Sequence, residues 1–402
     1  MDQLQTKCLH SDSKIKFESS DVSAPIHIST TFNYHENYNY NQAVNRNLSP
    51  YPIINNNETT SNDNAHIYSR DSTETRTRLE SVLGALENAH AVTYSSGLAA
   101  IFALLQHVQP LHIIMSKEGY HGTHGVVDLY CKNRNVKIDF YDTVPGYDIF
   151  KTIKKGLVLL ESPQNPRGEV VDLEAIVPLL SDNVVVAVDA TFAPPPLQSL
   201  LSHGVDIVMH STTKSLGGHS DLLGGVLMTK SKDVYEQLLH DRMFLGSVMG
   251  NLECWLLLRS LRTLKIRVLQ QSQTATQLTT WLTSNSEPCL SIIAKVHHAS
   301  IPTHPGHDAY LRQGTSNFPS VLSIDFITHN HARLICSHLR LFHNATSLGG
   351  VESLIEWRAA VDPKIDPRLC RVSIGLEEFV DLQSDLRLGF LKVLQLVGDH
   401  QP

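Results

Sequence analysis

The chain has 402 residues, of which 42% are apolar and 18% are charged, and this composition is typical of a globular protein with two or three domains. A net charge of −7 without a block of Lys or Arg argues against nucleic-acid binding. No apolar run is long enough to span a membrane, the N-terminus lacks a hydrophobic signal segment, and the six cysteines form no CxxC pair. We therefore expect a cytoplasmic protein without a membrane or nucleic-acid partner.

The first part of the chain contains a segment of unusual composition. Residues 33–64 include eleven asparagines and show little apolar periodicity. Such a segment buries too little apolar surface to offset the entropy lost on ordering it. We interpret it as a loop or disordered insertion within an N-terminal arm, residues 1–66.

From residue 67 onwards, short apolar runs alternate with helical patterns. Helices are predicted at residues 77–86, 98–108 and 172–180. Strands are predicted at residues 113–115, 137–141, 157–161, 184–189, 207–210 and 225–229. Several of these strands are apolar throughout, as strands covered on both faces should be. The alternation predicts an α/β domain with a mostly parallel sheet over residues 67–262.

After about residue 252 the chain becomes mostly helical. Residues 251–284 are predicted to form one long or broken helix whose outer face carries Arg259, Arg262, Lys265 and Arg267. Beyond it, predicted strands at 321–326 and 370–374 mix with predicted helices at 330–341 and 382–396. This mixture predicts a smaller α+β domain over residues 263–402.

Reactive and polar residues stand at the carboxyl ends of three predicted strands, where open α/β sheets bind their ligands. Asp189 ends one strand, Lys214 closes the Ser-Thr-Thr-Lys run after another, and Asn165 lies between two prolines after a third. Pyridoxal 5'-phosphate (PLP) requires such a set, because it needs a lysine for its Schiff base and an aspartate that keeps the pyridine nitrogen protonated.

A phosphate group also needs hydrogen-bond donors. Gly97, at the start of a predicted helix, would offer backbone N–H groups and the positive end of the helix dipole, and Ser211 and Thr213 would add hydroxyl groups. The histidines form no HExxH or comparable set, so we expect no metal site.

Nine short motifs extend this pattern over about residues 65–390. They are YSR (68–70), SSGLAA (95–100), ESPQNP (161–166), DATF (189–192), HSTTK (210–214), GHSD (218–221), WLLLRSLRT (255–263), SLGGVES (347–353) and RVSIG (371–375). In kind and order they resemble the Cys/Met-metabolism family of PLP-dependent enzymes, which includes cystathionine γ-synthase, cystathionine γ- and β-lyases and methionine γ-lyase. Residues 347–358 resemble a fungal branch of that family.

The resemblance implies where the cofactor would bind. Lys214 would hold PLP and shuttle a proton between substrate carbons, Asp189 would pair with the pyridinium nitrogen, and Tyr120 would stack on the ring and act in proton transfer. The other implied cofactor contacts are Gly97, Leu98, Ser211, Thr213 and Asn165, with Tyr68 and Arg70 reaching the phosphate of a neighbouring subunit.

The resemblance also implies how the substrate and the subunits are arranged. Arg371 would clamp the substrate α-carboxylate, since a planar guanidinium matches a carboxylate, and Asn165 and Ser347 would help to position the substrate. The implied fold is the PLP-dependent transferase fold type I, with a large, mostly parallel seven-stranded sheet domain and a smaller α+β C-terminal domain. The implied assembly is a homotetramer built from dimers that share active sites.

Departures from the family pattern leave the reaction open. Thr346 stands where γ-synthases and γ-lyases often carry Glu and bacterial β-lyases carry Tyr, and Ala190 and Ser215 replace an Asn and a Tyr. We expect a transsulfuration enzyme of the cystathionine γ-synthase or γ-lyase type that acts on a small sulfur amino acid. Cystathionine β-lyase or methionine γ-lyase activity is the alternative on the same scaffold. A PLP-binding protein with little catalysis is the alternative from another class.

Overall fold

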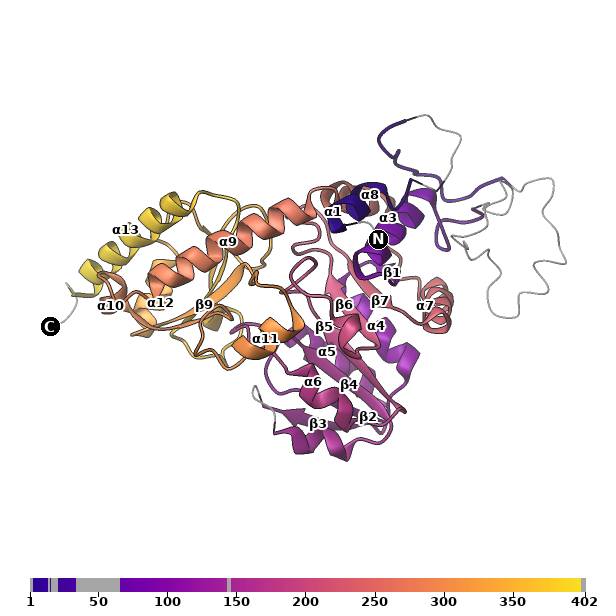
Figure 1. The fold of residues 1–402 in the computed structure, drawn as a ribbon, viewed down its shortest axis with the longest axis horizontal. Coiled ribbons are helices and arrows are strands. Elements are labelled where there is room, and N and C mark those ends of the chain that lie inside the picture. Colours follow the sequence, from indigo (N-terminus) through magenta and orange to yellow (C-terminus); the bar gives the residue numbers. More distant parts are fainter. Residues whose placement is uncertain (1–2, 14, 16–20, 34–65, 143–145, 399–402) are drawn as a thin grey trace.

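Two β-sheets organise the chain (Figure 1). The computed structural model describes residues 3–13, 15, 21–33, 66–142 and 146–398. Residues 90–229 supply the strands of the first sheet and residues 293–373 those of the second. The insertion predicted over residues 33–64 lies outside the described residues, apart from residue 33.

The first sheet has seven strands in the order β1-β7-β6-β5-β4-β2-β3. Their bounds are β1 (His90–Tyr94), β2 (His112–Ser116), β3 (Lys137–Tyr141), β4 (Gly156–Glu161), β5 (Val184–Asp189), β6 (Ile207–Ser211) and β7 (Gly225–Thr229). Strand β7 is antiparallel to both of its neighbours, and all other pairs are parallel. The prediction of a large, mostly parallel sheet is confirmed, and six of its strands were predicted.

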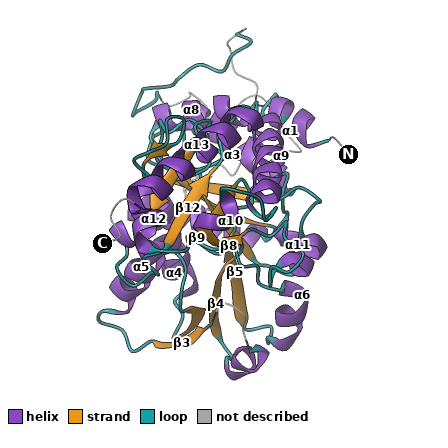
Figure 2. Cartoon of the chain, turned by 90° about the vertical axis from the view of Figure 1, so that its left-hand side faces the viewer, coloured by secondary structure: helices purple, strands orange, loops and turns teal. Residues whose placement is uncertain are grey.

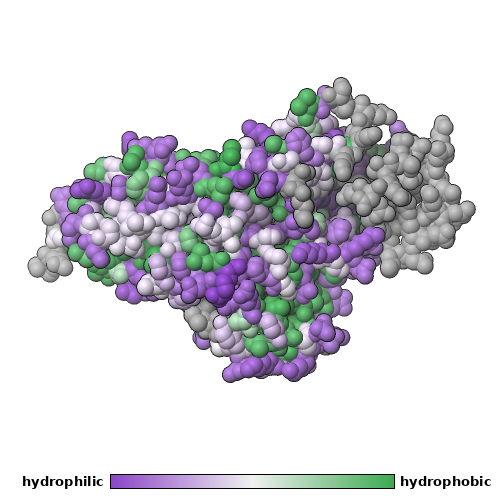
Figure 3. Space-filling model, viewed as in Figure 1, coloured by the Kyte–Doolittle hydropathy of each residue, from purple (hydrophilic) through white to green (hydrophobic). Residues whose placement is uncertain are grey.

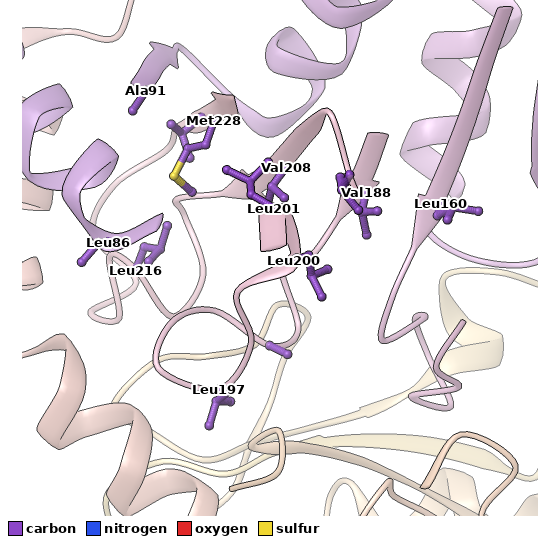
Figure 4. Packing of buried hydrophobic residues seen from close by; sticks show 14 of the residues in the cluster. Leu86, Ala91, Leu160, Val188, Leu197, Leu200, Leu201, Val208, Leu216 and Met228 are labelled. Atoms are coloured by element: carbon purple, nitrogen blue, oxygen red, sulfur yellow. The ribbon is translucent and has the colours of Figure 1, made fainter. Parts of the chain in front are cut away.

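Helices and loops bury apolar side chains on both faces of this sheet. Within β4, Val158 and Leu160 join one hydrophobic cluster, whereas Leu157 and Leu159 join another on the opposite face. Figure 4 shows part of the first cluster, where side chains of neighbouring strands lie between Leu160 at one end of the view and Leu86 at the other. The helices here are α1 (Leu4–His10), α3 (Glu74–Glu87), α4 (Gly97–Val108), α5 (His121–Cys131), α6 (Leu173–Ile176), α7 (Lys232–Leu245) and α8 (Asn251–Leu261), with short 3-10 turns at Tyr147–Thr152, Val177–Leu179 and Leu200–His203.

The second sheet has five strands in the order β10-β11-β12-β9-β8. Its strands are β8 (Ile293–His297), β9 (Val321–Phe326), β10 (His343–Asn344), β11 (Leu354–Trp357) and β12 (Leu369–Ser373). Around it lie α9 (Leu264–Leu282), α10 (Cys289–Ile292), α12 (His329–Ile335), α13 (Phe379–Gly398) and a 3-10 turn at Arg358–Ala360 (Figure 2). Helix α11 (His307–Gln313) instead buries Ala309 and Tyr310 in the first cluster. The predicted α+β character of this part is confirmed, whereas the domain boundaries at 66 and 262 stay predictions.

The expectation that Arg267 lies on an outer helix face is wrong. The predicted helix 251–284 is broken, because α8 ends at Leu261 and Thr263 leaves helical geometry before α9 begins. The break turns Arg267 inwards, where its side chain is buried. Its guanidinium donates to the backbone carbonyls of Ser215 at 3.0 Å and of Ser260 at 3.0 Å. This side chain therefore ties the start of α9 to the segment that follows Lys214.

The surface of the described residues is mixed in character. Figure 3 shows hydrophilic and hydrophobic residues interspersed on the face in view. Among the described helices, none combines the length and the apolar character needed to cross a bilayer.

Candidate active site

Three neighbouring strands bring their last residues together at one edge of the seven-stranded sheet. Strand β5 lies between β4 and β6, and Glu161 at the end of β4 is the register partner of Asp189 at the end of β5. The backbone N–H of Ser211, at the end of β6, donates to Thr191 Oγ1 at 2.9 Å. The predicted meeting of these strand ends is thus present in the structure.

Asp189 is buried and held by one neighbour. Its Oδ1 accepts hydrogen bonds from the backbone N–H of Thr191 at 3.0 Å and from the hydroxyl of Thr191 at 2.5 Å. Burial raises the pKa of Asp189, while the hydrogen bonds from Thr191 and the field of Lys214 oppose that rise. Since both bonds use Oδ1, the second oxygen is available to a cationic partner, which would keep this carboxylate charged.

The start of helix α4 lies against the end of β6. Ser96 caps the helix by accepting from the backbone N–H of Ala99 at 3.0 Å. A Cβ atom placed on Gly97 would lie 3.3 Å from Ser211 Oγ, so only a glycine allows this approach without displacement. The first N–H groups of a helix have no partner within it, so Gly97 and Leu98 can donate to an anion beside Ser211.

Thr213 has a different local role from the one the resemblance implies. Its hydroxyl accepts from the backbone N–H of Gly224 at 3.0 Å and donates to the carbonyl of the same residue at 3.3 Å. Because the Thr213 hydroxyl makes both of these bonds to Gly224, it could donate to a phosphate only after its bond to the Gly224 carbonyl breaks. Ser211 is the better placed of the two hydroxyl groups.

Lys214 reaches across to the second half of the chain. Its Nζ donates to Ser347 Oγ at 2.8 Å. Burial, together with the nearby positive charge of Arg371, lowers the pKa of Lys214 to about 8. Ser347 itself has a positive φ of 91°, which is rare for a residue with a side chain and is found at functional sites.

Arg371 lies on β12, close to both Asn165 and Ser347. The guanidinium donates from Nη1 to Asn165 Oδ1 at 3.0 Å and from Nη2 to the carbonyl of Ser347 at 3.0 Å. It also forms a buried ion pair with Glu356 on β11 at 2.7 Å. The structure thus brings together the three residues that the resemblance assigns to the substrate, although they come from segments up to 206 positions apart.

Glu161 is a residue of the site to which sequence reasoning gave no role. Its Oε2 accepts from the backbone N–H of Tyr120 at 2.8 Å, and its Oε1 accepts from the backbone N–H of Asn165 at 2.7 Å. Burial and the neighbouring Asp189 both raise the pKa of Glu161. The available sequence signal was its position, because it ends an apolar strand in the same way as Asp189.

Tyr120 and Asp189 both line one small cavity. Thr123, His124 and Glu161 belong to the same lining. A Cβ atom on Gly122 would come 2.5 Å from the Tyr120 ring, so this glycine makes room for the aromatic side chain. The predicted ring-stacking residue and the predicted carboxylate therefore face one space.

Tyr68 and Arg70 lie in a different environment. The Arg70 guanidinium lies 5.5 Å from the centre of the Tyr68 ring and donates to the carbonyl of Met243 at 3.2 Å. Tyr68 is 43% exposed and forms an isolated β-bridge with Thr31. Within the described residues, no hydrogen bond joins either side chain to Gly97, Ser211 or Lys214.

The donor set matches PLP group by group. A carboxylate with a spare oxygen suits the ring nitrogen, an amine of lowered pKa suits the aldehyde, and a helix start beside a hydroxyl suits the phosphate. Asp189 at the end of β5, Ser211 at the end of β6, Lys214 just after β6 and Gly97 at the start of α4 supply these groups. The residues present therefore fit the cofactor.

Comparison with known proteins agrees with this fit. The sequence matches the family model described as Cys/Met metabolism PLP-dependent enzyme over residues 5–391. Cystathionine beta-lyase MetC of Bacillus subtilis is 32% identical over 347 residues, which cover 82% of this chain and 87% of that enzyme. Cystathionine gamma-lyase of Saccharomyces cerevisiae is 31% identical over 409 residues, which cover 96% of each chain.

The fold has a close counterpart among solved structures. Cystathionine gamma synthase of Xanthomonas oryzae pv. oryzae, solved with aminoacrylate and cysteine, superposes with a TM-score of 0.86 at 27% identity, covering 98% of this chain and 99% of that one. The chain belongs to the Cys/Met-metabolism family of PLP-dependent enzymes, and PLP is its cofactor.

Proposed function

We propose that this chain is a transsulfuration enzyme that carries out elimination or replacement on a sulfur amino acid, with cystathionine as substrate or product. The observation that carries the proposal is the chain of contacts from Lys214 through Ser347 to Arg371. It places a proton-transfer amine beside a carboxylate-binding guanidinium, as α-amino-acid chemistry requires. Of the three proteins compared above, two are named cystathionine lyases and one is named a cystathionine synthase.

The site residues divide the work between binding and proton transfer. Arg371 binds the substrate carboxylate and so fixes Cα near Lys214. When bound, PLP supplies an electron sink that stabilises negative charge at Cα. Lys214 Nζ accepts the Cα proton and returns it to a later carbon, and the Ser347 hydroxyl orients that amine. The pKa of about 8 for Lys214 lies near the range in which an amine can accept and release protons at neutral pH.

The remaining residues hold the reacting groups in place. Asp189 would pair with the ring nitrogen of bound PLP, and the Thr191 hydroxyl fixes the orientation of this carboxylate. Tyr120 would pack on the ring of bound PLP, and Glu161 accepts hydrogen bonds from the backbone N–H groups of Tyr120 and Asn165. Asn165 in turn orients Arg371.

Lys214→Ala tests the proposal directly. We expect the variant to lose covalently attached PLP and to lose turnover by at least about 10³-fold, because it lacks both the attachment point and the proton acceptor. Borohydride reduction followed by mass spectrometry should place PLP on the Lys214 peptide of the wild type. Lys392→Ala, which removes an exposed lysine on α13, is the matched control and should keep both properties. PLP found on another lysine would contradict the proposal.

Product analysis identifies the reaction. Thr346 is exposed and brings neither a charge nor a ring, so we keep γ-synthase or γ-lyase chemistry as the main proposal and β-lyase or methionine γ-lyase as the alternative. Purified holoenzyme would be given a panel of sulfur amino acids and activated homoserines. Pyruvate marks β-elimination, 2-oxobutanoate marks γ-elimination, and cystathionine formed from an activated homoserine marks the synthase. A holoenzyme that converts none of them would fit the binding-protein alternative.

We also propose that the chain forms a homotetramer in the cytoplasm, built from dimers that share active sites. The arrangement of Tyr68 and Arg70 away from Lys214 supports shared sites, because these residues would then serve a neighbouring subunit. The proposed domains are residues 1–66, 67–262 and 263–402. One apolar cluster confined to residues 275–393 supports a separate C-terminal domain.

A further inference from the structure

The guanidinium of Arg371 already has a carboxylate partner within the protein. Its Nη2 makes two hydrogen bonds, one to the carbonyl of Ser347 at 3.0 Å and one to Glu356 Oε2 at 2.7 Å. Glu356 and Arg371 are register partners on the antiparallel strands β11 and β12, so their side chains leave the same face of the sheet.

This arrangement conflicts with a two-pronged grip on a substrate. A carboxylate binds a guanidinium bidentately either through Nη1 and Nη2 or through Nε and Nη2, so both arrangements use a hydrogen of Nη2. Both Nη2 hydrogens are engaged here. A substrate carboxylate must therefore displace either the carbonyl of Ser347 or the carboxylate of Glu356.

Glu356 also contacts a second cation, Arg358. Its Oε2 also pairs with Arg358 Nη1 at 2.6 Å, and Arg358 follows on the same side of the chain, two residues further on. All three side chains are buried, with at most 7% of each exposed. Glu356 Oε1 and Arg358 Nε are buried without a hydrogen-bond partner. The two side chains could therefore form a second hydrogen bond with each other.

We propose that Glu356 occupies the carboxylate position on Arg371 until substrate binds, and that Arg358 then takes over Glu356. The inference rests on the proposed role of Arg371 as the substrate clamp. Arg358 and Glu356 act as positioning residues for that clamp, and the exchange favours ligands that carry a carboxylate.

Charge balance explains why Arg358 is needed. Arg371, Arg358 and Glu356 together carry a net charge of about +1, so a bound substrate carboxylate makes the buried group neutral. Without Arg358, two carboxylates would share one guanidinium, which leaves an uncompensated negative charge in a buried place. The substrate carboxylate would then compete with Glu356 for Arg371, and its affinity would fall.

The test measures ligand binding to the holoenzyme instead of turnover. The first probe is L-alanine, which has an amine and a carboxylate but no leaving group, and the second is ethylamine, which has no carboxylate. Binding of each is followed by the absorbance of the bound cofactor. We expect Arg358→Met to raise the Kd of L-alanine at least about tenfold, as expected when a charge-assisted bond is lost, and to leave the Kd of ethylamine unchanged.

A double variant isolates the exchange from general damage. In Arg358→Met/Glu356→Gln the internal competitor is gone, so we expect the Kd of L-alanine to return to within about threefold of the wild-type value. Arg358→Lys, which keeps the charge and reduces the risk of misfolding, should keep most of the affinity. Equal weakening of both probes, an unchanged Kd in Arg358→Met, or a double variant as weak as the single one would each overturn the inference.

Failure of the proposed function gives a different result. If Arg371 is not the substrate clamp, Arg371→Met will bind L-alanine as tightly as the wild type, whatever the Arg358 variants do. If Arg371→Met loses L-alanine selectively while Arg358→Met does not, the clamp stands and only the exchange is refuted.

Discussion

At the scale of single residues, the site depends on the charge state of Lys214. An amine attacks an aldehyde only in its neutral form, and burial lowers the pKa of this amine to about 8. The value of about 8 already includes the positive charge of Arg371, which also lowers the pKa, and the negative charges of Glu356 and Asp189, which raise it. The neighbours of Lys214 therefore decide at which pH it becomes reactive.

The pH dependence of cofactor attachment follows from these neighbours. We expect the rate at which apoenzyme binds PLP covalently to rise with pH through about 8 and to level off above it, since the neutral amine then dominates. Arg371→Met should move the midpoint to higher pH, because a positive charge is lost. Glu356→Gln should move it to lower pH, because a negative charge is lost. Stopped-flow absorbance measures the rates, and shifts in the same direction for both variants would contradict this account.

Site residues could be proposed from the sequence, but their hydrogen-bond partners could not. Asp189 and Lys214 were visible in the sequence because each follows a recognisable strand and because PLP needs both residue types. The bonds of Thr213 to Gly224 and of Glu356 to Arg371 depend on backbone positions and strand register that residue types do not reveal. Glu161 had no predicted role for the same reason, since its partners are backbone N–H groups.

At the scale of elements, helix α9 supports the loop that carries Lys214. The buried Arg267 near its start donates to the carbonyls of Ser215 and Ser260. A Cβ atom on Gly218, which has a φ of 70°, would lie 2.0 Å from Arg267 Nη1, so this glycine lets the guanidinium pass. The helix and the loop are thus joined by one side chain.

Removal of that side chain should weaken the fold. We expect Arg267→Met to lower the free energy of unfolding by about 2–4 kcal/mol, because buried carbonyl groups lose their donor. Arg259→Met, at an exposed position on α8, is the control and should change it by less than about 0.5 kcal/mol. Denaturant unfolding of the two holoenzymes followed by circular dichroism compares them. Equal stability of the two variants would show that Arg267 is dispensable.

Elements were predictable where a local pattern decided them. Strands β3, β5, β7 and β9 have the predicted bounds. Strands β5 and β7 are apolar runs that end at a polar residue, whereas polar residues interrupt β3 and β9. Strand β1 was missed since its run is short and begins with His90. The predicted helix 330–341 is shorter in the structure, where α12 ends at Ile335, and the inward side of Arg267 could not be foreseen because it results from a break at Thr263.

At the scale of the whole molecule, the N-terminal arm is incompletely buried within one chain. Val22 and Ile28 are almost fully exposed, and Tyr68, which forms a β-bridge with Thr31 of the same arm, is 43% exposed. Exposed apolar side chains on an extended segment are typical of a surface that another chain covers. This supports the proposal that the arm completes an active site in a second subunit.

Complementation between two inactive variants tests whether the site is shared. Arg70→Ala would damage the arm and Lys214→Ala the cofactor attachment, so each homo-oligomer alone should be impaired. In a mixed dimer, the subunit with an intact Lys214 would receive an intact Arg70 from its neighbour. After co-expression in equal amounts, random pairing predicts about a quarter of the wild-type number of complete sites.

The control uses two residues that the structure places in one site. Asp189→Ala and Lys214→Ala act on the same site of the same chain, so their mixture should recover no activity. Activity and covalently bound PLP would be measured on hybrids that carry two different affinity tags. Recovery with the Arg70→Ala mixture alone would show that the arm acts on a neighbour. The absence of recovery in both mixtures would show instead that Arg70 acts within its own chain or outside the site.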